Sequence, residues 1–407
     1  MSLLLRNRAA LLLLMFNLFL VFTGIGLVIP VMPKFMAELE ISGSIVGLLV
    51  AAFSLTQLLF SPLAGRLSDS LGRKPIIVLG MIAFALSEWL FGAAQSTFVL
   101  FASRMLGGVG AALIMPAVMA YTADVTSSAE RAKGMGFMNA AITTGFIIGP
   151  GIGGYLAEFG IRVPFYAAAV AGAVAATITA FILPESLSAD QRASSNAMPQ
   201  RKREKNQNLL TQLIRSYSEP YFPSLVIVFV MSFGLANYET IYSLFVDHKF
   251  GFTPKDIAFI ITFGSIAGAV VQVTVFGWLL NRFGERRVIS TCLLMASLFV
   301  FLTLFVSSFW MIFAVTFIVF LSIDILRPAV STQMSIMAED QQGYVAGLNS
   351  AFTSLGNIIG PVVAGVLLDV NLNYPYTLAA LILLISFVLS SRSGRRKTKL
   401  SGSGPTR

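Results

Sequence analysis

The sequence predicts an all-α integral membrane protein in which twelve spanning helices form two pseudo-symmetric six-helix bundles. Of its 407 residues, 56% are hydrophobic and only 12% are charged, whereas soluble chains carry roughly a quarter charged residues. The hydrophobic residues form runs of about 20, long enough to cross a bilayer core. The two halves of the chain also repeat each other.

The apolar runs predict helices rather than barrel strands. Barrel strands alternate apolar and polar residues over about 10 positions, but runs such as LILLISFVLS at 381–390 are continuous. Backbone groups inside lipid have no water to bind, so such runs satisfy their hydrogen bonds as helices. We expect twelve spans, at about 9–33, 44–64, 75–95, 98–122, 134–158, 163–183, 221–246, 255–280, 288–307, 309–334, 343–368 and 374–391.

The polar segments divide the chain. Residues 1–183 and 221–391 are the two predicted bundles, 184–220 is a solvated linker that contains RKREK, and 392–407 is a basic tail. If both termini are cytoplasmic, four of the 28 Lys and Arg residues lie outside, two lie within spans, and the other 22 are cytoplasmic. Basic residues favour cytoplasmic loops, so we expect both termini in the cytoplasm.

The repeat has a nearly constant offset. GRLSDSLGRKP begins at Gly65 and GWLLNRFGERR at Gly277, 212 residues later. GFMNAAITTGFIIGPGIGG begins at Gly136 and GLNSAFTSLGNIIGPVVAG at Gly347, 211 residues later. Parallel repeats of this kind are typical of transporters that rock two bundles around a central site.

Several classes of function find no support in the sequence. One cysteine, Cys292, and one histidine, His248, which we place in a short loop, cannot form the usual zinc site. No G-x-x-x-x-G-K-[ST] phosphate loop is present. We attribute the net charge of +9 to basic residues in cytoplasmic loops rather than to a surface that binds nucleic acid. We therefore expect no enzyme, metal site, cofactor or nucleic-acid partner.

The loop 65–74 has glycine, acid and base at fixed spacing. Gly65 and Gly72 permit close approach and a tight turn. Asp69 can pair with a basic residue or cap the next helix, and Arg73 and Lys74 lie at the cytoplasmic face. The alternative is an ordinary solvated basic loop. In the second copy Asn281 replaces Asp69.

A glycine face marks the fifth predicted span. Gly145, Gly149 and Gly153 recur every four residues, so they share one helix face and permit close helix packing. Pro150 removes a backbone hydrogen bond, and Gly154 follows the repeat. Packing alone is the simpler interpretation of this segment.

Charged residues inside spans are candidates for function. An ionised acid at the bilayer centre costs about 2.5–3.5 kcal/mol on insertion scales, so Glu239 and Asp324 are candidate proton carriers. Arg327 lies three residues after Asp324, on the same helix face, and can pair with it; a structural salt bridge is the alternative. Arg104 either assists proton transfer or pairs with a neighbour. Glu88 lies toward the outer end of its span, where it either joins in coupling or simply contacts water.

The chain resembles the drug–proton antiporters of the major facilitator superfamily, most closely the NorA and Bmr group of multidrug exporters. The resemblance rests on GIGLVIPVMP (24–33), GFIIGPGIGG (145–154), RMLGGVGAA (104–112), FGLANYETIYSLF around Glu239 and SIDILRPAV around Asp324. It implies the major facilitator fold. It makes loop 65–74 a conformational latch, 145–154 an exporter motif, and Glu239 with Asp324 the proton-coupling acids.

The resemblance implies proton-coupled efflux of amphiphilic, often cationic compounds, such as dyes and fluoroquinolone-type antibiotics, by alternating access. An adaptable apolar cavity suits such ligands. Its candidate lining residues are Phe16, Asn17, Gln57, Met115, Phe146, Tyr238, Tyr242 and Asn357. The alternatives are a narrow exporter of one metabolite or antibiotic class (tetracycline-like, for example), a proton-coupled importer, and a membrane sensor that transports nothing. We expect a monomer in the bacterial cell membrane, with small molecules, protons and lipids as partners.

Overall fold

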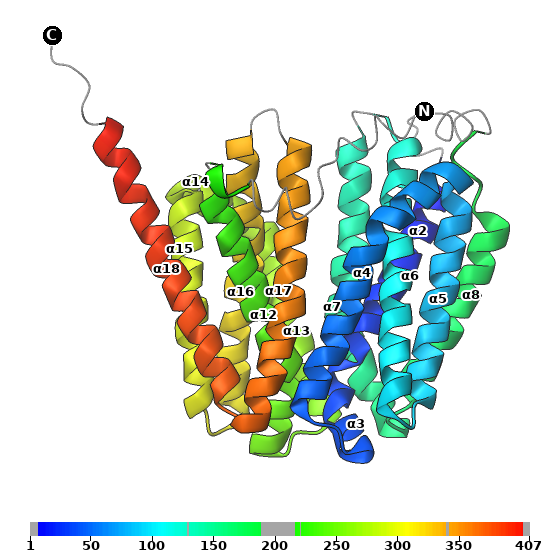
Figure 1. The fold of residues 1–407 in the computed structure, drawn as a ribbon, viewed down its shortest axis with the longest axis horizontal. Coiled ribbons are helices and arrows are strands. Elements are labelled where there is room, and N and C mark those ends of the chain that lie inside the picture. Colours follow the sequence, from blue (N-terminus) through cyan, green and yellow to red (C-terminus); the bar gives the residue numbers. More distant parts are fainter. Residues whose placement is uncertain (1–6, 128–129, 189–215, 220, 339–341, 402–407) are drawn as a thin grey trace, which may run out of the picture. The chain divides into compact units, whose positions relative to one another are not determined.

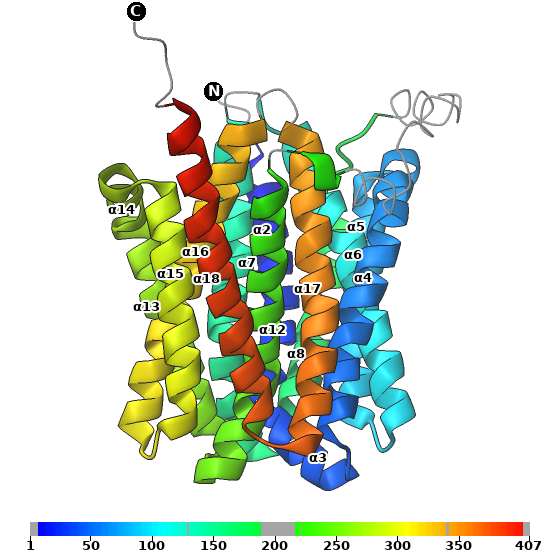
Figure 2. The same ribbon diagram turned by 60° about the vertical axis from the view of Figure 1, so that its left-hand side comes forward.

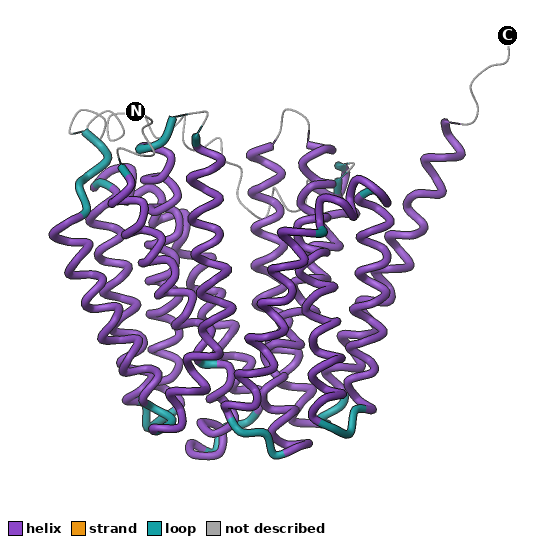
Figure 3. Tube along the Cα trace, turned by 180° about the vertical axis from the view of Figure 1, so that it is seen from behind, coloured by secondary structure: helices purple, strands orange, loops and turns teal. Residues whose placement is uncertain are grey.

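The protein is almost entirely helical in its computed structural model, which describes residues 7–127, 130–188, 216–219, 221–338 and 342–401. Figure 3 shows helices joined by short loops, with no strand in the described ranges. Within these ranges, twelve helical segments are long and apolar enough to cross a membrane, which confirms the predicted number. The RKREK segment of the predicted linker lies outside the described residues.

Among the described residues, the first half contains seven α-helices and two short 3₁₀ helices. They are α2 (Arg8–Leu27), η1 (Ile29–Val31), α3 (Met32–Leu39), α4 (Gly43–Leu71), α5 (Arg73–Ala93), α6 (Thr97–Asp124), α7 (Arg131–Leu156), η2 (Ala157–Phe159) and α8 (Val163–Ile182). The second half contains η3 (Ser216–Ser218), α12 (Phe222–Phe250), α13 (Pro254–Thr274), α14 (Phe276–Phe283), α15 (Glu285–Leu302), η4 (Thr303–Phe305), α16 (Phe309–Ala338), α17 (Gln342–Val370) and α18 (Tyr374–Ser401).

Two details differ from the sequence-based expectation. The predicted span 255–280 is divided, because α13 ends at Thr274 and α14 begins at Phe276. The division falls in the run VVQVTV, whose β-branched residues are weak helix formers. His248 lies in the last turn of α12 rather than in a loop.

The chain forms two compact units. Unit 1 comprises Met1–Ser42, Leu48–Asn206 and Val246–Thr262, and unit 2 comprises Gly43–Gly47, Gln207–Phe245 and Phe263–Arg407. In unit 1, α2 packs on α7, and α5 packs on α6 and α8 (Figure 1). In unit 2, α15 packs on α16 and α18 (Figure 2). Long, mostly apolar helices can pack this way because each buries a broad apolar surface.

Two glycines mark equivalent helix junctions in the repeat. Gly72, between α4 and α5, has φ +109°, and Gly284, between α14 and α15, has φ +76°. These values are in the region that only glycine adopts easily. The two residues are 212 positions apart, so the repeat preserves the backbone of this turn. Cys292, the only cysteine, is buried in α15.

Candidate functional site

The predicted coupling residues come together in unit 2. Glu239 on α12 interacts electrostatically with both Arg327 and Asp324 of α16, and Asp324 interacts with Arg327. Both carboxylates are half-buried and Arg327 is exposed. No direct ion pair joins Asp324 to Arg327 in the part of the chain that the structure describes, so the expected pairing is electrostatic rather than a contact.

A glycine of α13 makes room for Asp324. A Cβ atom placed on Gly268 would collide with Oδ2 of Asp324. The carboxylate therefore lies directly on the backbone of α13, where any larger residue would displace it. Gly268 was not among the predicted site residues, because a single glycine in an apolar span carries no distinctive signal.

The other two intramembrane charges meet in unit 1. The Nη2 atom of Arg104 on α6 lies 3.9 Å from Oε1 of Glu88 on α5. Both side chains are buried, Glu88 with 3% and Arg104 with 7% of its surface exposed. The interpretation that Glu88 simply contacts water is therefore wrong. Sequence position suggested the outer end of the span but did not show which face of the helix is buried.

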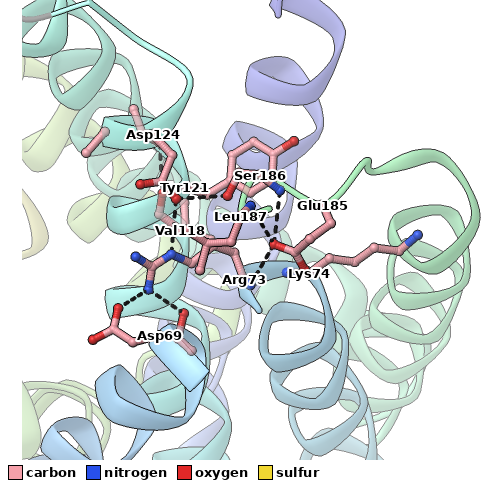
Figure 4. A network of polar contacts seen from close by, with 12 residues as sticks. Asp69, Arg73, Lys74, Val118, Tyr121, Asp124, Glu185, Ser186 and Leu187 are labelled. Atoms are coloured by element: carbon pink, nitrogen blue, oxygen red, sulfur yellow. Dashed lines mark hydrogen bonds and ion pairs between the residues drawn. The ribbon is translucent and has the colours of Figure 1, made fainter. Parts of the chain in front are cut away.

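The loop 65–74 is the centre of a polar network on unit 1 (Figure 4). The guanidinium of Arg73 donates hydrogen bonds to Asp69, to the hydroxyl of Ser68 and, through Nε, to Asp124 on α6 at 3.1 Å. Arg73 is buried. The loop is thus a structured junction and not merely a solvated basic segment, and Asp69 takes the pairing alternative rather than capping α5.

The cap of α5 comes from Glu185, which is not among the residues predicted from the sequence. Oε1 of Glu185 accepts a hydrogen bond from the backbone N–H of Arg73 at 2.9 Å, and Oε2 accepts one from Lys74 at 3.2 Å. Ser186 donates to Asp124 at 2.8 Å. An acid at a helix N-terminus accepts hydrogen bonds from unsatisfied N–H groups, and its negative charge interacts favourably with the helix dipole. The start of the predicted solvated linker is therefore attached to unit 1.

The second copy of this loop shows no such network among the residues that the structure describes. Glu285 stands where the first copy has Arg73, and Asn281 stands where it has Asp69. Asn281 is exposed, and Arg286 donates instead to the carbonyl of Ser390 at 3.3 Å. The reversed charge at Glu285 explains why the guanidinium-centred cluster exists in one copy only.

The glycine face of α7 packs against α2. A Cβ on Gly145 would lie 2.7 Å from the carbonyl oxygen of Phe19, and one on Gly149 would lie 2.7 Å from that of Thr23. Gly153 meets Leu27 in the same way. These three positions therefore leave space only for backbone. Helix α7 continues through Pro150 to Leu156, and Gly154 lies against Pro254 and Ala258 of α13 within the same unit.

The repeat reproduces this helix crossing in unit 2. Cβ atoms on Gly356 and Gly360 of α17 would lie 2.7 Å from backbone atoms of Phe233 on α12. These glycines follow Gly145 and Gly149 by 211 residues. The same close approach of two backbones therefore occurs once in each unit.

The predicted cavity residues fall into two groups. Phe16 and Phe146 are exposed by 46% and 43%, and Gln57, Met115 and Asn357 are half-buried. Asn17, Tyr238 and Tyr242 are wholly buried. Asn17 donates to Thr179 of α8, and the two tyrosine hydroxyls meet Thr316 of α16 at 3.1 and 3.2 Å. These three residues are interior packing groups in this structure, and their assignment to a ligand surface stays a prediction.

A cavity of about 520 Å³ in unit 1 lies apart from the predicted cavity residues. It is lined by Glu38, Leu39, Ala93, Gln95, Arg162 and Tyr166. Arg162 is already occupied there, because it pairs with Glu38 and donates to the carbonyls of Gly92 and Ala94 at 2.6 and 2.7 Å. This cavity contains none of the predicted substrate residues.

The resemblance to drug exporters is confirmed by comparison with curated proteins. The chain is 49% identical to Multidrug resistance protein 2 of Bacillus subtilis (strain 168) over 384 residues, 94% of this chain and 95% of the relative. It is 46% identical to Multidrug resistance protein 1 of the same organism over 385 residues, 95% and 96% of the two chains. Quinolone resistance protein NorA of Staphylococcus aureus (strain Mu50 / ATCC 700699) is 40% identical over 386 residues, with the same coverage.

Solved structures share the fold at low sequence identity. A bacterial homolog of the human lysosomal transporter Spinster, in an inward-facing and unoccupied conformation, gives a TM-score of 0.77 at 17% identity, covering 95% of this chain and 97% of the other. The human organic anion transporter MFSD10 gives 0.67 at 21% identity, covering 94% and 99%. The family model described as Major Facilitator Superfamily matches residues 14–235 and 224–405. With its twelve predicted spans present and this match across both halves, the chain belongs to the Major Facilitator Superfamily.

Proposed function

We propose that this protein is a proton-coupled multidrug exporter of the bacterial cell membrane. It expels amphiphilic, often cationic compounds, including dyes and fluoroquinolone-type antibiotics, by alternating access. Its relatives support the drug class, since they are named for multidrug and quinolone resistance. The protein acts as a monomer with both termini in the cytoplasm, and residues 1–183 and 221–391 are its two bundles.

The charge balance around Arg327 carries the proposal. Glu239, Asp324 and Arg327 interact electrostatically, and two ionised carboxylates beside one guanidinium leave a single uncompensated negative charge. In a half-buried site of low dielectric, such a charge is costly until it is neutralised. Either a proton or a cationic drug can neutralise it. Because the proton and the cationic drug compete for the same carboxylates, binding of one displaces the other, and the protein exchanges drug for protons.

The membrane potential and the proton gradient drive this exchange. Moving one elementary charge through 100 mV supplies about 2.3 kcal/mol. Protons enter from outside, protonate Glu239 or Asp324 and weaken the binding of a cationic drug. Binding that differs between two conformations shifts the equilibrium between them. The exposed Phe16 and Phe146 provide apolar surface for the drug.

The decisive experiment is ethidium efflux from cells that express the chain, with and without a protonophore. We expect efflux that the protonophore abolishes, and loss of that efflux in Glu239→Gln and Asp324→Asn. The exposed Glu40 supplies the control variant Glu40→Gln, which should retain wild-type efflux. If both acid variants keep full gradient-driven efflux, the coupling assignment is wrong.

Two further measurements separate the alternatives. A panel of dyes and antibiotics tests breadth, and expulsion of only one compound class would identify a narrow exporter. Right-side-out vesicles under an inward proton gradient test direction, and accumulation of substrate inside them would identify an importer. Absence of all flux would identify a membrane sensor.

A further inference from the structure

The buried pair of Glu88 and Arg104 lies outside the cluster that carries the proposed function. Arg104 lies over the ring of Phe91 with its Cζ 4.2 Å from the centroid. That ring packs on Phe165 and Phe35, with centroids 4.5 and 5.2 Å away. The aromatic cluster holds the guanidinium in place by packing and cation–π attraction. The positive charge therefore remains beside α5 whether or not Glu88 is ionised.

The pair is incompletely satisfied. Among the described residues, Oε2 of Glu88 and the Nε and Nη2 atoms of Arg104 have no hydrogen-bond partner. The charged group that acts on Glu88 is Arg104 of α6, while α2 contributes the non-ionisable Gly24. A structural ion pair normally satisfies its donors and acceptors, since unsatisfied buried groups destabilise the fold. The two side chains approach only to 3.9 Å, and each keeps polar atoms without a hydrogen-bond partner. Such a loose pair suits a carboxyl group that changes protonation.

Glu88 also lies close to α2, the helix that meets the glycine face of α7. A Cβ on Gly24 of α2 would lie 2.5 Å from the ring of Phe84 and 3.5 Å from Oε1 of Glu88. The neighbouring residue Thr23 lies against α7, because a Cβ placed on Gly149 would be 2.7 Å from the carbonyl oxygen of Thr23. Consecutive residues of α2, Thr23 and Gly24, therefore lie near the glycine face of α7 and near the Glu88 carboxylate.

We propose that Glu88 is a second proton-binding site of the transporter, located in unit 1, with Arg104 as its positioning residue. The carboxylate takes up one proton to become the neutral acid and later releases it, and no other bond changes. The uptake and release alter the packing of α2 between α5 and α7. This inference rests on the proposed function, because it adds a proton site to a proton-coupled exporter.

The test is the number of protons released when the purified full-length protein binds ethidium in weakly buffered detergent solution. In the wild type, ethidium displaces protons from every coupled carboxyl group. We expect Glu88→Gln to release fewer protons per molecule than the wild type, the difference being the contribution of one carboxyl group. The matched control is Glu38→Gln, because Glu38 also pairs with an arginine, Arg162, beside the same aromatic cluster, but its side chain is 41% exposed. The control should release the wild-type number.

A purely structural pair gives a different result. Glu88→Gln would then lower the melting temperature and leave the proton count per folded molecule unchanged, which would overturn the inference. If Glu88→Gln does not fold, Arg104→Lys keeps the positive charge and serves instead. We expect it to move the pH midpoint of ethidium-induced proton release, and an unmoved midpoint would overturn the inference. Absence of proton release and of protonophore-sensitive efflux in the wild type would instead refute the proposed function.

Discussion

The carboxylate of Glu185 accepts a hydrogen bond from the backbone N–H of Arg73, at 2.9 Å. This contact joins the segment after α8 to the N-terminus of α5. We expect Glu185→Gln to destabilise the protein by about 0.3–1 kcal/mol, because the substitution removes a negative charge from a helix N-terminus. Thermal unfolding of the purified protein measures the loss. Glu40→Gln, at an exposed position of the same unit, should leave the melting temperature unchanged.

The two glycines of loop 65–74 should respond in opposite ways to alanine. Gly72 has φ +109°, and a Cβ there would collide with Glu185, so Gly72→Ala should destabilise by about 1–3 kcal/mol. Gly65 is helical and has nothing within 4 Å of a Cβ. Gly65→Ala should be neutral or stabilising by up to about 1 kcal/mol. Equal melting temperatures for the two variants would contradict this description of the turn.

The contact of α7 with α2 predicts a similar contrast within one helix. Gly149→Ala would place a methyl group 2.7 Å from the carbonyl oxygen of Thr23 and force the helices apart. We expect it to lower ethidium efflux and thermal stability together, because overpacking typically costs about 1–3 kcal/mol. Gly136→Ala on the same helix has open space around it and should preserve both. Wild-type efflux in Gly149→Ala would show that the close approach is dispensable.

The space that Gly268 leaves for Asp324 makes another prediction. Gly268→Ala should displace the Asp324 carboxylate and reduce proton-driven efflux much as Asp324→Asn does. Gly264→Ala on the same helix would place its Cβ 3.3 Å from the ring of Phe320 and at ordinary contact distance, 4.0 Å, from Cα of Phe317, and it should transport normally. The measurement is the initial rate of ethidium efflux at matched expression. Full activity in Gly268→Ala would show either that Asp324 takes no part in coupling or that its carboxylate does not lie against α13.

One threonine hydroxyl contacts both tyrosines of α12, and Tyr238 is also hydrogen-bonded to Thr303. Thr316 is wholly buried between Tyr238 and Tyr242. We expect Thr316→Val to destabilise by about 1–3 kcal/mol, because it removes two buried hydrogen bonds. Thr274→Val removes a hydroxyl that only meets a carbonyl of its own helix at an exposed position, and it should have little effect. If instead Thr316→Val changes drug specificity without loss of stability, the tyrosines line the ligand site after all.

The sequence was sufficient for features that depend on composition and spacing. Twelve spans follow from apolar length alone, and the residues around Glu239 and Asp324 follow from the rarity of charge in lipid. The glycine face at Gly145, Gly149 and Gly153 follows from helical periodicity.

Features that depend on which helix face turns inward could not be predicted. Helices with apolar residues on all sides carry no signal for orientation, so the sequence does not show that Asn17, Tyr238 and Tyr242 are buried. The role of Glu185 depends on a contact 112 positions away along the chain. No local pattern distinguishes such an acid from an ordinary linker residue.

The burial of Cys292 makes the native chain suitable for site-directed spectroscopy. A thiol reacts as its exposed thiolate, so this buried cysteine should label slowly, while introduced surface cysteines label fast. Gln95 and Ser307 are both exposed and stand 212 residues apart, at equivalent places of the repeat. A Gln95→Cys, Ser307→Cys double variant would carry two spin labels without removal of Cys292. Their distance distribution, recorded with and without ethidium, would follow the working cycle of the intact transporter directly.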